Sequence, residues 1–191
     1  MRSSTRRAYP MQMAVSTRRW TIADWERLPR DGNRYEVVAG ELFVTPMPAP
    51  GHQIVVQRLW EALIPYVRRW GLGSVFAAGV DVFVGADEVV EPDLAVFGVP
   101  EEALPKRWKD APTPILVAEV RSESTWRRDV GPKRHLYTSG RINVYWIVDR
   151  EERTVRVVQP DLADAVIADV LRWHPAGAGE PLEVELSGIF R

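Results

Sequence analysis

The sequence predicts an α/β or mixed α+β fold, with a central mixed β-sheet flanked by helices. The run 115–120 is almost entirely apolar, which is typical of a strand covered on both faces. A strand, a helix and a second strand follow one another over 115–148, the length of a right-handed parallel crossover. The chain has 191 residues, 46% hydrophobic and 27% charged, so we expect one compact domain over 20–191.

The first half of the chain alternates between helix and strand signals. Thr21 can cap a short helix at 21–28, and the run 35–44 is typical of a hairpin that turns at Ala39–Gly40. Apolar residues then recur at helical spacing over 52–70, and glycines end this predicted helix. Three β-like runs follow, at 74–78, 80–84 and 89–97.

The second half contains the strongest strand signals. A polar, proline-rich loop at 100–114 precedes the buried strand 115–120. Asp129 is the expected cap of a helix with Pro132 in its first turn, and 143–148 is a second buried strand. The crossover would make the two buried strands parallel members of one sheet. Meandering outer strands are expected at 153–158, 165–173 and 182–186.

Composition narrows the function classes and the compartment. The chain has no cysteine, which excludes disulfides, thiolate zinc sites and a cysteine nucleophile, and favours a cytoplasmic location. No apolar stretch has the length of a membrane helix. The net charge of −1 gives no support to a protein that coats nucleic acid through bulk charge. The basic start, 1–19, is interpreted as a disordered leader, with a basic arm for a polyanion as the alternative.

Positive charge gathers in one internal stretch. Over 121–134, five basic residues stand against two acidic ones, a local net charge of +3. This stretch is either a basic face or the solvated surface of a helix. On the first interpretation, its contacts with nucleic acid are Arg127, Arg128 and Arg134. Trp108 lies between basic residues in the proline-rich loop and is the tryptophan expected to be exposed for such a contact.

Glu119 is the only charged residue inside the run 114–120. Burying a lone carboxylate is costly unless the group is paired or binds a metal. Two ordinary arrangements would satisfy it: an ion pair with Arg121, or a place at the solvent end of the strand. Taken alone, Glu119 therefore leaves a structural and a functional interpretation open.

Asp93 favours the functional interpretation, because it opens the β-like run 94–97. If this run and the strand 115–120 are neighbours, the carboxylates of Asp93 and Glu119 converge on an oxygen site suited to Mg²⁺ or Mn²⁺. Such an ion polarises a phosphoryl oxygen and lowers the pKa of a bound water. The pair therefore predicts hydrolysis of phosphodiester bonds.

A nuclease of this kind also needs a cation beside the attacking water. Arg121 lies two residues after Glu119 and so points the same way from the strand. Lys133 lies in the first turn of the following helix, whose N-terminus stands over the carboxyl end of the strand. Lysine can lose its proton when buried and arginine essentially cannot, so a role that handles a proton favours Lys133.

Several motifs occur in one order along the chain and together resemble a known family. They are Tyr35–Leu42 (YEVVAGEL), Gly51–Gln53 (GHQ), Glu91–Asp93 (EPD), Val117–Ser122 (VAEVRS), Asp129–Arg134 (DVGPKR) and Tyr145–Asp149 (YWIVD). Over about 20–159, this set is similar to the Uma-type family of restriction endonucleases, which belongs to the PD-(D/E)xK nuclease superfamily. The resemblance implies a restriction-endonuclease-like fold and a metal-dependent DNA endonuclease.

Carried over by position, the resemblance implies that Asp93 and Glu119 bind the metal. It also implies that Lys133 replaces the lysine that other superfamily members hold two residues after the glutamate. Arg121 occupies the position of that lysine, where the family usually has an apolar residue followed by Ser-Pro-Ser. The chain departs from this pattern, since it has Ser122, Glu123 and Ser124 there.

Two further residues are accessory candidates. Glu36 either borders the site as a further ligand or faces solvent in the hairpin. For His52, near a helix start, a surface or capping role is the commoner one, and orientation of water or phosphate is the functional alternative. Because the superfamily commonly cuts two strands with two subunits, a homodimer is expected by analogy.

The alternative function is that of a catalytically weak or inactive nuclease-fold protein, acting as a nucleic-acid-binding or regulatory module. Arg121 and Glu123 keep this alternative open, because they change the charge beside the predicted metal site. A third interpretation is a purely structural protein in which Glu119 pairs with Arg121. The distance between the carboxylates of Asp93 and Glu119, and whether Lys133 points into the space between them, distinguishes these interpretations.

Overall fold

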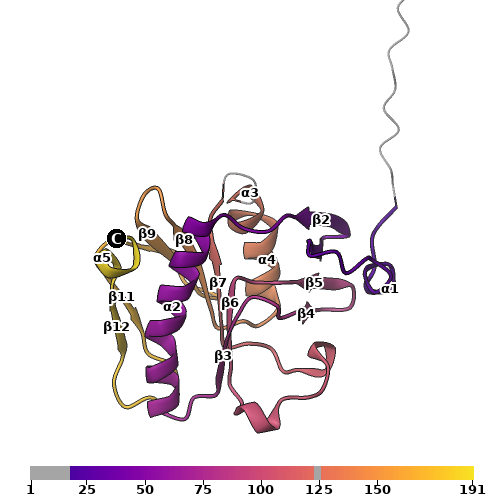
Figure 1. The fold of residues 1–191 in the computed structure, drawn as a ribbon. Coiled ribbons are helices and arrows are strands. Elements are labelled where there is room, and N and C mark those ends of the chain that lie inside the picture. The colour runs from indigo at the N-terminus through magenta and orange to yellow at the C-terminus, as the bar shows by residue number, and fades with distance from the viewer. Residues whose placement is uncertain (1–17, 123–125) are drawn as a thin grey trace, which may run out of the picture.

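The computed structural model describes residues 18–122 and 126–191, and a six-stranded mixed β-sheet forms its centre (Figure 1). In spatial order its strands are β10 (Ala165–Ile167), β9 (Thr154–Val158), β8 (Val144–Asp149), β7 (Leu116–Val120), β6 (Leu94–Phe97) and β3 (Ser74–Ala77). β7 and β8 run parallel, whereas the other neighbouring pairs are antiparallel. The predicted central mixed sheet and its parallel pair are therefore confirmed.

Helices lie on both faces of this sheet. In the part of the chain that the structure describes, the helices are α1 (Ile22–Trp25), α2 (Pro50–Arg69), α3 (Trp126–Val130), α4 (Pro132–Ser139) and α5 (Leu186–Ile189), with 3-10 turns η1 (Glu101–Ala103) and η2 (Trp108–Asp110). α2 crosses one face and α4 covers the other (Figure 1). α3 and α4 together make the crossover between β7 and β8.

The two faces of β7 differ in content, because successive side chains of a strand point to opposite faces. Leu116, Ala118 and Val120 belong to the core that packs under α2. Val117 belongs to the second core, on the side of α4. Glu119 faces the same way as Val117, so this strand directs its one carboxylate toward α4.

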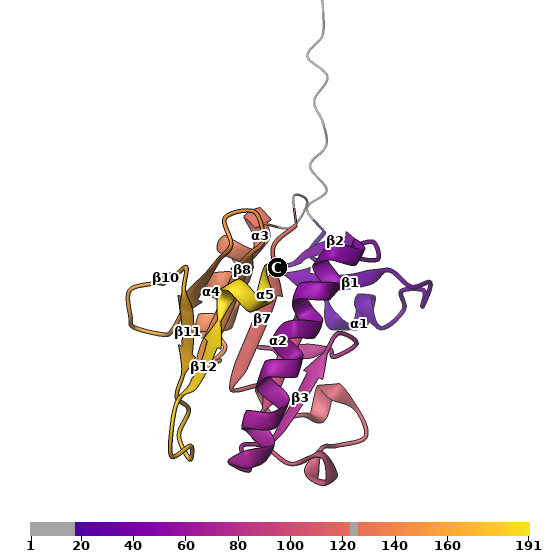
Figure 2. The same cartoon turned by 60° about the vertical axis from the view of Figure 1, so that its left-hand side comes forward.

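The core under α2 is closed by a small hairpin. Its strands are β11 (Val170–Trp173) and β12 (Leu182–Glu185), which pair antiparallel beside α2 (Figure 2). Leu59 and Leu63 of α2 pack in one apolar cluster with Leu171 and Trp173 of the hairpin. Burial of these side chains, at roughly 25 cal/mol per Å² of apolar surface, is the main force that holds α2 against the sheet.

The opposite core is closed by a second, four-stranded sheet. Its strands, in order, are β2 (Glu41–Thr45), β1 (Arg34–Val38), β5 (Glu88–Val90) and β4 (Val82–Val84). Val38, Val82 and Val90 of this sheet pack with Leu136 and Tyr137 of α4. The candidate site residues lie where this sheet, α4 and the six-stranded sheet meet.

Several local predictions are confirmed. Thr21 caps α1 in a capping box with Asp24. The hairpin β1–β2 turns at Ala39 and Gly40, which have φ values of 54° and 79°, as a primed hairpin turn requires. The predicted leader falls outside the described residues except for Arg18 and Arg19. No helix among the described residues combines the length and apolar character needed to cross a bilayer.

Two predicted strands are each divided between two sheets. The run 89–97 forms β5 and β6, which lie in different sheets on either side of Pro92. Proline has no backbone N–H to donate, so the ladder is interrupted there. The run 165–173 likewise forms β10 in the six-stranded sheet and β11 in the small hairpin.

The predicted role of Asp129 as a helix cap is wrong. Asp129 lies inside α3 and is buried, and the N-cap of α4 is Gly131. The reason is Pro132, which disfavours helical geometry in the residue before it and so separates α3 from α4. Pro132 then occupies the start of α4, where its missing N–H has no cost.

Candidate active site

The register of the central sheet brings Asp93 and Glu119 together. β6 and β7 pair antiparallel with Leu94 opposite Ala118, so Asp93, one residue earlier, lies beside Glu119. The Asp93 Oδ2 atom accepts a hydrogen bond of 2.7 Å from the backbone N–H of Val120. The side chains are buried, since Asp93 is 5% and Glu119 3% exposed. The two runs are therefore neighbouring strands, which is the condition for Asp93 and Glu119 to converge.

Lys133 reaches the same point from α4. Its Nζ atom lies 2.7 Å from Glu119 Oε1 and 2.7 Å from Glu36 Oε1. Tyr137 lies one turn further along α4, on the same helix face, and its hydroxyl donates to Glu119 Oε1 at 2.8 Å. Two donors on one helix face therefore hold Glu119 in a single position.

Glu36 comes from β1 of the four-stranded sheet and is only 1% exposed. Its Oε1 atom accepts the backbone N–H of Glu91 at 3.0 Å, in addition to the contact with Lys133. Its Oε2 atom lies 3.9 Å from Nη1 of Arg128. Glu36 therefore borders the site and does not face solvent in the hairpin.

Asp93 has two basic partners besides the backbone. Arg34 donates from Nη1 to Oδ1 at 2.9 Å, and His52 Nε2 lies 3.0 Å from Oδ2. The surface interpretation of His52 is wrong, because the first turn of α2 is docked against the sheet and leaves His52 6% exposed. Sequence reasoning missed Arg34. Its spacing of two residues from Glu36, which puts both on one face of β1, is the signal that could have found it.

Arg121 does not enter the carboxylate pair. Its guanidinium forms an ion pair with Asp149, at the end of β8, and lies 5.1 Å from the ring centre of Trp126. Glu119 is instead paired with Lys133, so the interpretation with a Glu119–Arg121 ion pair is wrong. Two residues beyond Glu119, the chain has left β7 and turned toward the neighbouring strand. Glu123 and Ser124 lie outside the described residues.

These side chains line a cleft of about 240 Å³, here called the carboxylate cleft. Its interior holds Glu36, Asp93, Glu119 and Lys133, and residues 46–49, between β2 and α2, line it as well. Arg121 and Arg128 also line it. The cleft thus combines buried carboxylates with basic groups from several separate elements.

Burial and charge act differently on the cleft residues. Burial raises the pKa of Glu119 to about 8, an effect that Lys133 opposes and Asp93 reinforces. Burial alone would lower the pKa of Lys133, but the charges of Glu119 and Glu36 outweigh it and raise that pKa. Burial alone would also raise the pKa of Asp93, but the hydrogen bond from His52 and the charge of Arg34 outweigh it and lower that pKa. Lys133 is therefore a fixed cation and Asp93 a fixed anion.

The three arginines predicted to contact nucleic acid differ in position. Arg127 is exposed on α3. Arg128 is turned inward, where it donates to Thr45 Oγ1 at 2.9 Å and lies over the ring of Phe43. Arg134 is paired with Asp164, with 2.6 Å between Nη2 and Oδ1. Only Arg127 of the three extends into solvent without a described ion pair.

The expected exposure of Trp108 is also wrong. Its ring stacks on Phe97, with 5.7 Å between ring centres, and meets the edge of Phe76 at 5.2 Å. One face of the half-buried indole packs the proline-rich loop against the sheet, which its basic neighbours in the sequence do not reveal.

The donor set of the carboxylate cleft fits a hard divalent cation. Glu119 uses Oε1 for both Lys133 and Tyr137, so in the described chain its Oε2 accepts no hydrogen bond. Over residues 18–122 and 126–191, no group of three or more His, Cys, Asp or Glu side chains has the arrangement of a metal site. Mg²⁺ usually takes one or two carboxylates and completes its shell with water and substrate phosphate. Asp93 and Glu119 match that incomplete protein shell.

Comparison with known proteins agrees with the fold. A family model named Uma2, described as "Putative restriction endonuclease", matches residues 22–185. The crystal structure of a "putative nuclease belonging to DUF820" from Anabaena variabilis ATCC 29413 is similar with a TM-score of 0.74 and 20% identity. That match covers 89% of this chain and 97% of the other. No curated protein matches the chain significantly.

The fold is therefore that of a restriction-endonuclease-like protein, and the family and the structural neighbour together support a nuclease. The chain belongs to the Uma2 family, whose model covers it from α1 to the end of β12.

Proposed function

We propose that this protein is a Mg²⁺- or Mn²⁺-dependent DNA endonuclease that hydrolyses phosphodiester bonds in the carboxylate cleft. The observation that carries the proposal is the placement of Asp93 and Glu119 side by side on β6 and β7, with Lys133 hydrogen-bonded to Glu119. Asp93 and Glu119 would hold the metal ion. Bound there, the ion supplies a polarised phosphoryl oxygen and a water of lowered pKa.

The protein's own residues have separable roles in this proposal. Lys133, as a fixed cation, stabilises negative charge that develops on the phosphoryl oxygens. Arg34 and His52 hold the Asp93 carboxylate in one orientation, and Tyr137 does the same for Glu119. These four act before substrate arrives, because each is already in contact with a carboxylate. The cleft is therefore preorganised.

The charges around the cleft suit an anionic substrate. Arg34, Arg121 and Arg128 line it, and Arg127 is exposed on the adjacent helix. Phosphate contacts of this type position a nucleic acid without reading its sequence. We propose Arg127 as the outer phosphate contact, and a homodimer as the assembly that cuts both strands of a duplex.

The direct test is cleavage of supercoiled plasmid by the purified full chain with Mg²⁺, with Mn²⁺ and with a chelator. We expect nicked and linear products with either metal and none with chelator. Asp93→Asn and Glu119→Gln should each slow cleavage by about 100- to 1,000-fold or more. Asp87→Asn, an exposed carboxylate in the turn between β4 and β5, is the matched control and should cleave as the wild type does. Equal cleavage by wild type and Asp93→Asn would reject the proposal.

A second candidate function is that of a catalytically weak or inactive nucleic-acid-binding module. It is favoured by one observation: Asp93 already receives hydrogen bonds from Arg34 and the backbone of Val120, and Lys133 already bridges two carboxylates. Such a network is stable without a metal. DNA binding by wild type and by Asp93→Asn, with no cleavage by either in Mg²⁺ or Mn²⁺, would establish this function.

A further inference from the structure

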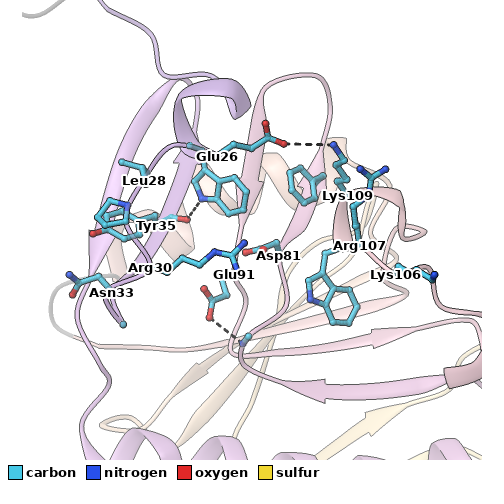
Figure 3. Close-up of a pocket in the computed structure, with 16 residues that line it drawn as sticks. Glu26, Leu28, Arg30, Asn33, Tyr35, Asp81, Glu91, Lys106, Arg107 and Lys109 are labelled. Atoms are coloured by element: carbon cyan, nitrogen blue, oxygen red, sulfur yellow. Dashed lines mark hydrogen bonds and ion pairs between the residues drawn. The ribbon is translucent and has the colours of Figure 1, made fainter.

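A larger recess, of about 750 Å³, lies on the outer side of the four-stranded sheet (Figure 3). It is bounded by α1, by the start of β4 and by the η2 turn. Its volume falls in the usual range of small-molecule sites. We call it the outer recess, and none of the roles proposed above uses it.

Two carboxylates form the floor of the outer recess. β4 pairs with β5 so that Val82 lies opposite Val90, which brings Asp81 and Glu91 side by side at the strand ends. Glu91 accepts the backbone N–H of Gly79 at 3.1 Å. In the described chain no group donates a hydrogen bond to the Asp81 carboxylate. Burial together with Glu91 raises the pKa of Asp81 to about 6, against the opposing charge of Arg30. Asp81 is thus an acceptor that a ligand can use.

The walls of the outer recess are aromatic and already held in place. Trp25 donates from its indole nitrogen to the carbonyl of Tyr35 at 2.7 Å and meets Phe83 edge to face at 5.7 Å. Trp108, on the other side, is stacked on Phe97. A flat apolar ligand would therefore meet surfaces that lose little freedom on binding.

Basic side chains surround the opening. Lys106, Arg107 and Lys109 come from the loop around η2, and Arg30 comes from the segment after α1 (Figure 3). Lys109 lies 3.7 Å from Glu26 across the opening, and Arg107 is paired with Asp110. Arg30 points toward Asp81 and Glu91 inside the recess (Figure 3), whereas Lys106 forms no ion pair within the described residues and remains available for an anionic group.

A third cavity adjoins both the outer recess and the carboxylate cleft. This cavity of about 380 Å³ shares Gly32, Asn33 and Glu91 with the recess, and Arg34 and Asp93 with the cleft. Glu91 and Asp93 are only two residues apart along the chain. One nucleic-acid strand could therefore occupy both places, with a phosphate in the cleft and a base in the recess.

We propose that the outer recess binds one unpaired nucleotide of the nucleic-acid substrate, with guanine as the preferred base. Guanine presents two adjacent N–H donors on one edge, and a single carboxylate accepts both. Asp81 would receive that edge, Trp25 and Trp108 would flank the ring, and Lys106 would contact the phosphate. Thymine presents its one N–H between two carbonyl oxygens, which a carboxylate repels. The biological setting of this site rests on the proposed nuclease function, but nucleotide binding itself does not.

The test is calorimetric titration of the full chain with 2′-deoxyguanosine 5′-monophosphate (dGMP) and thymidine 5′-monophosphate (TMP), in the presence of a chelator. We expect saturable binding of dGMP that is about tenfold or more tighter than that of TMP, the discrimination typical of one bidentate contact. Asp81→Asn should reduce dGMP affinity by about tenfold and should raise TMP affinity, because the repulsion of the thymine carbonyl oxygens is removed. Lys106→Gln should weaken both nucleotides by the same factor, and Asp87→Asn, the matched control, should change neither.

Absence of nucleotide binding to the wild type, or equal affinity for dGMP and TMP, would overturn the proposal. Equal dGMP affinity in wild type and folded Asp81→Asn would overturn it too. Binding of trilysine peptide without nucleotide binding would assign the recess to a cationic partner and reject a nucleotide. Because the chelator removes the metal, dGMP binding with no plasmid cleavage would reject only the nuclease function. Cleavage without dGMP binding would reject only the recess.

Discussion

The carboxylate cleft and the outer recess both place two carboxylates side by side at strand ends, yet their surroundings differ. In the cleft, Glu119 and Asp93 each have a basic partner in direct contact, Lys133 and Arg34. In the recess, Asp81 has Arg30 as a basic neighbour but forms no ion pair or hydrogen bond with a basic side chain of the described residues. Cations from other elements hold the carboxylates of Asp93 and Glu119 in fixed positions. In the recess, the Asp81 carboxylate remains an acceptor for a ligand. Shared residue types therefore do not imply a shared role.

Removal of Lys133, the basic partner in the cleft, should have the largest effect on stability. Lys133→Met leaves Glu36 and Glu119 buried without their cation, so we expect the free energy of unfolding to fall by about 3–5 kcal/mol. Lys133→Met combined with Glu119→Gln should recover part of this loss, because one buried charge is then removed. Urea denaturation measures both. Lys106→Gln, at the opening of the recess, should leave stability unchanged, and equal stability of Lys133→Met and Lys106→Gln would contradict the comparison.

The identity of the catalytic cation gives the next largest effect. Lys133→Gln should slow plasmid cleavage by about 100-fold or more, the typical effect of deleting one preorganised donor. Arg121→Gln should change the rate by less than about threefold, because Arg121 is engaged with Asp149 and not with Glu119. Single-turnover kinetics measure both rates. A larger loss in Arg121→Gln than in Lys133→Gln would transfer the catalytic role to Arg121.

Removal of the Tyr137 hydroxyl in the cleft should have a smaller effect on the free energy of unfolding. Tyr137→Phe removes a buried hydrogen bond to Glu119, and we expect a loss of about 1–1.5 kcal/mol in the free energy of unfolding. Tyr35→Phe removes an exposed hydrogen bond to Asp31 beside the recess and should leave that free energy nearly unchanged. Thermal and urea denaturation of the two variants compare buried with exposed contacts. Equal losses would mean that the burial of the cleft network has no energetic consequence.

The smallest expected effect is the pH dependence contributed by Asp81. Its pKa is raised from the ordinary value of 3.8 to about 6 in the folded protein, so folding disfavours its charged form. The resulting destabilisation is fully present above about pH 6 and disappears as the pH falls toward 3.8. The melting temperature of Asp81→Asn should therefore exceed that of the wild type at pH 7.5, and the difference should shrink by pH 4.5. A constant difference would show that Asp81 is not desolvated.

Much of the fold could be predicted from the sequence, because it depends on local apolar patterns. The run around Val117 is almost entirely apolar, and its spacing from the next buried strand suits a crossover. The structure has the parallel pair that these two features indicate. The boundaries that failed lie at Pro92, at Pro132 and within 165–173, where the chain changes sheet or helix. Those breaks depend on which sheet the next segment joins, and that choice is made by tertiary packing.

The candidate site was predictable in part for a similar reason. Glu119 stands out as a lone charge in an apolar strand, and Lys133 follows from the geometry of a crossover. Arg34 and Tyr137 could not be found in this way, because each contacts its carboxylate through a different element of the fold. The position of Asp81 beside Glu91 could not be found from the sequence either, because it depends on the pairing of β4 with β5.

The proposed nuclease function requires that Asp93 and Glu119 jointly hold a divalent cation. Its most direct test is electron paramagnetic resonance titration of the full chain with Mn²⁺, with and without a phosphorothioate duplex that resists cleavage. We expect one Mn²⁺ per chain, bound at least about tenfold more weakly by Asp93→Asn and by Glu119→Gln and equally well by Asp81→Asn. Equal Mn²⁺ affinity in wild type, Asp93→Asn and Glu119→Gln would contradict the claim.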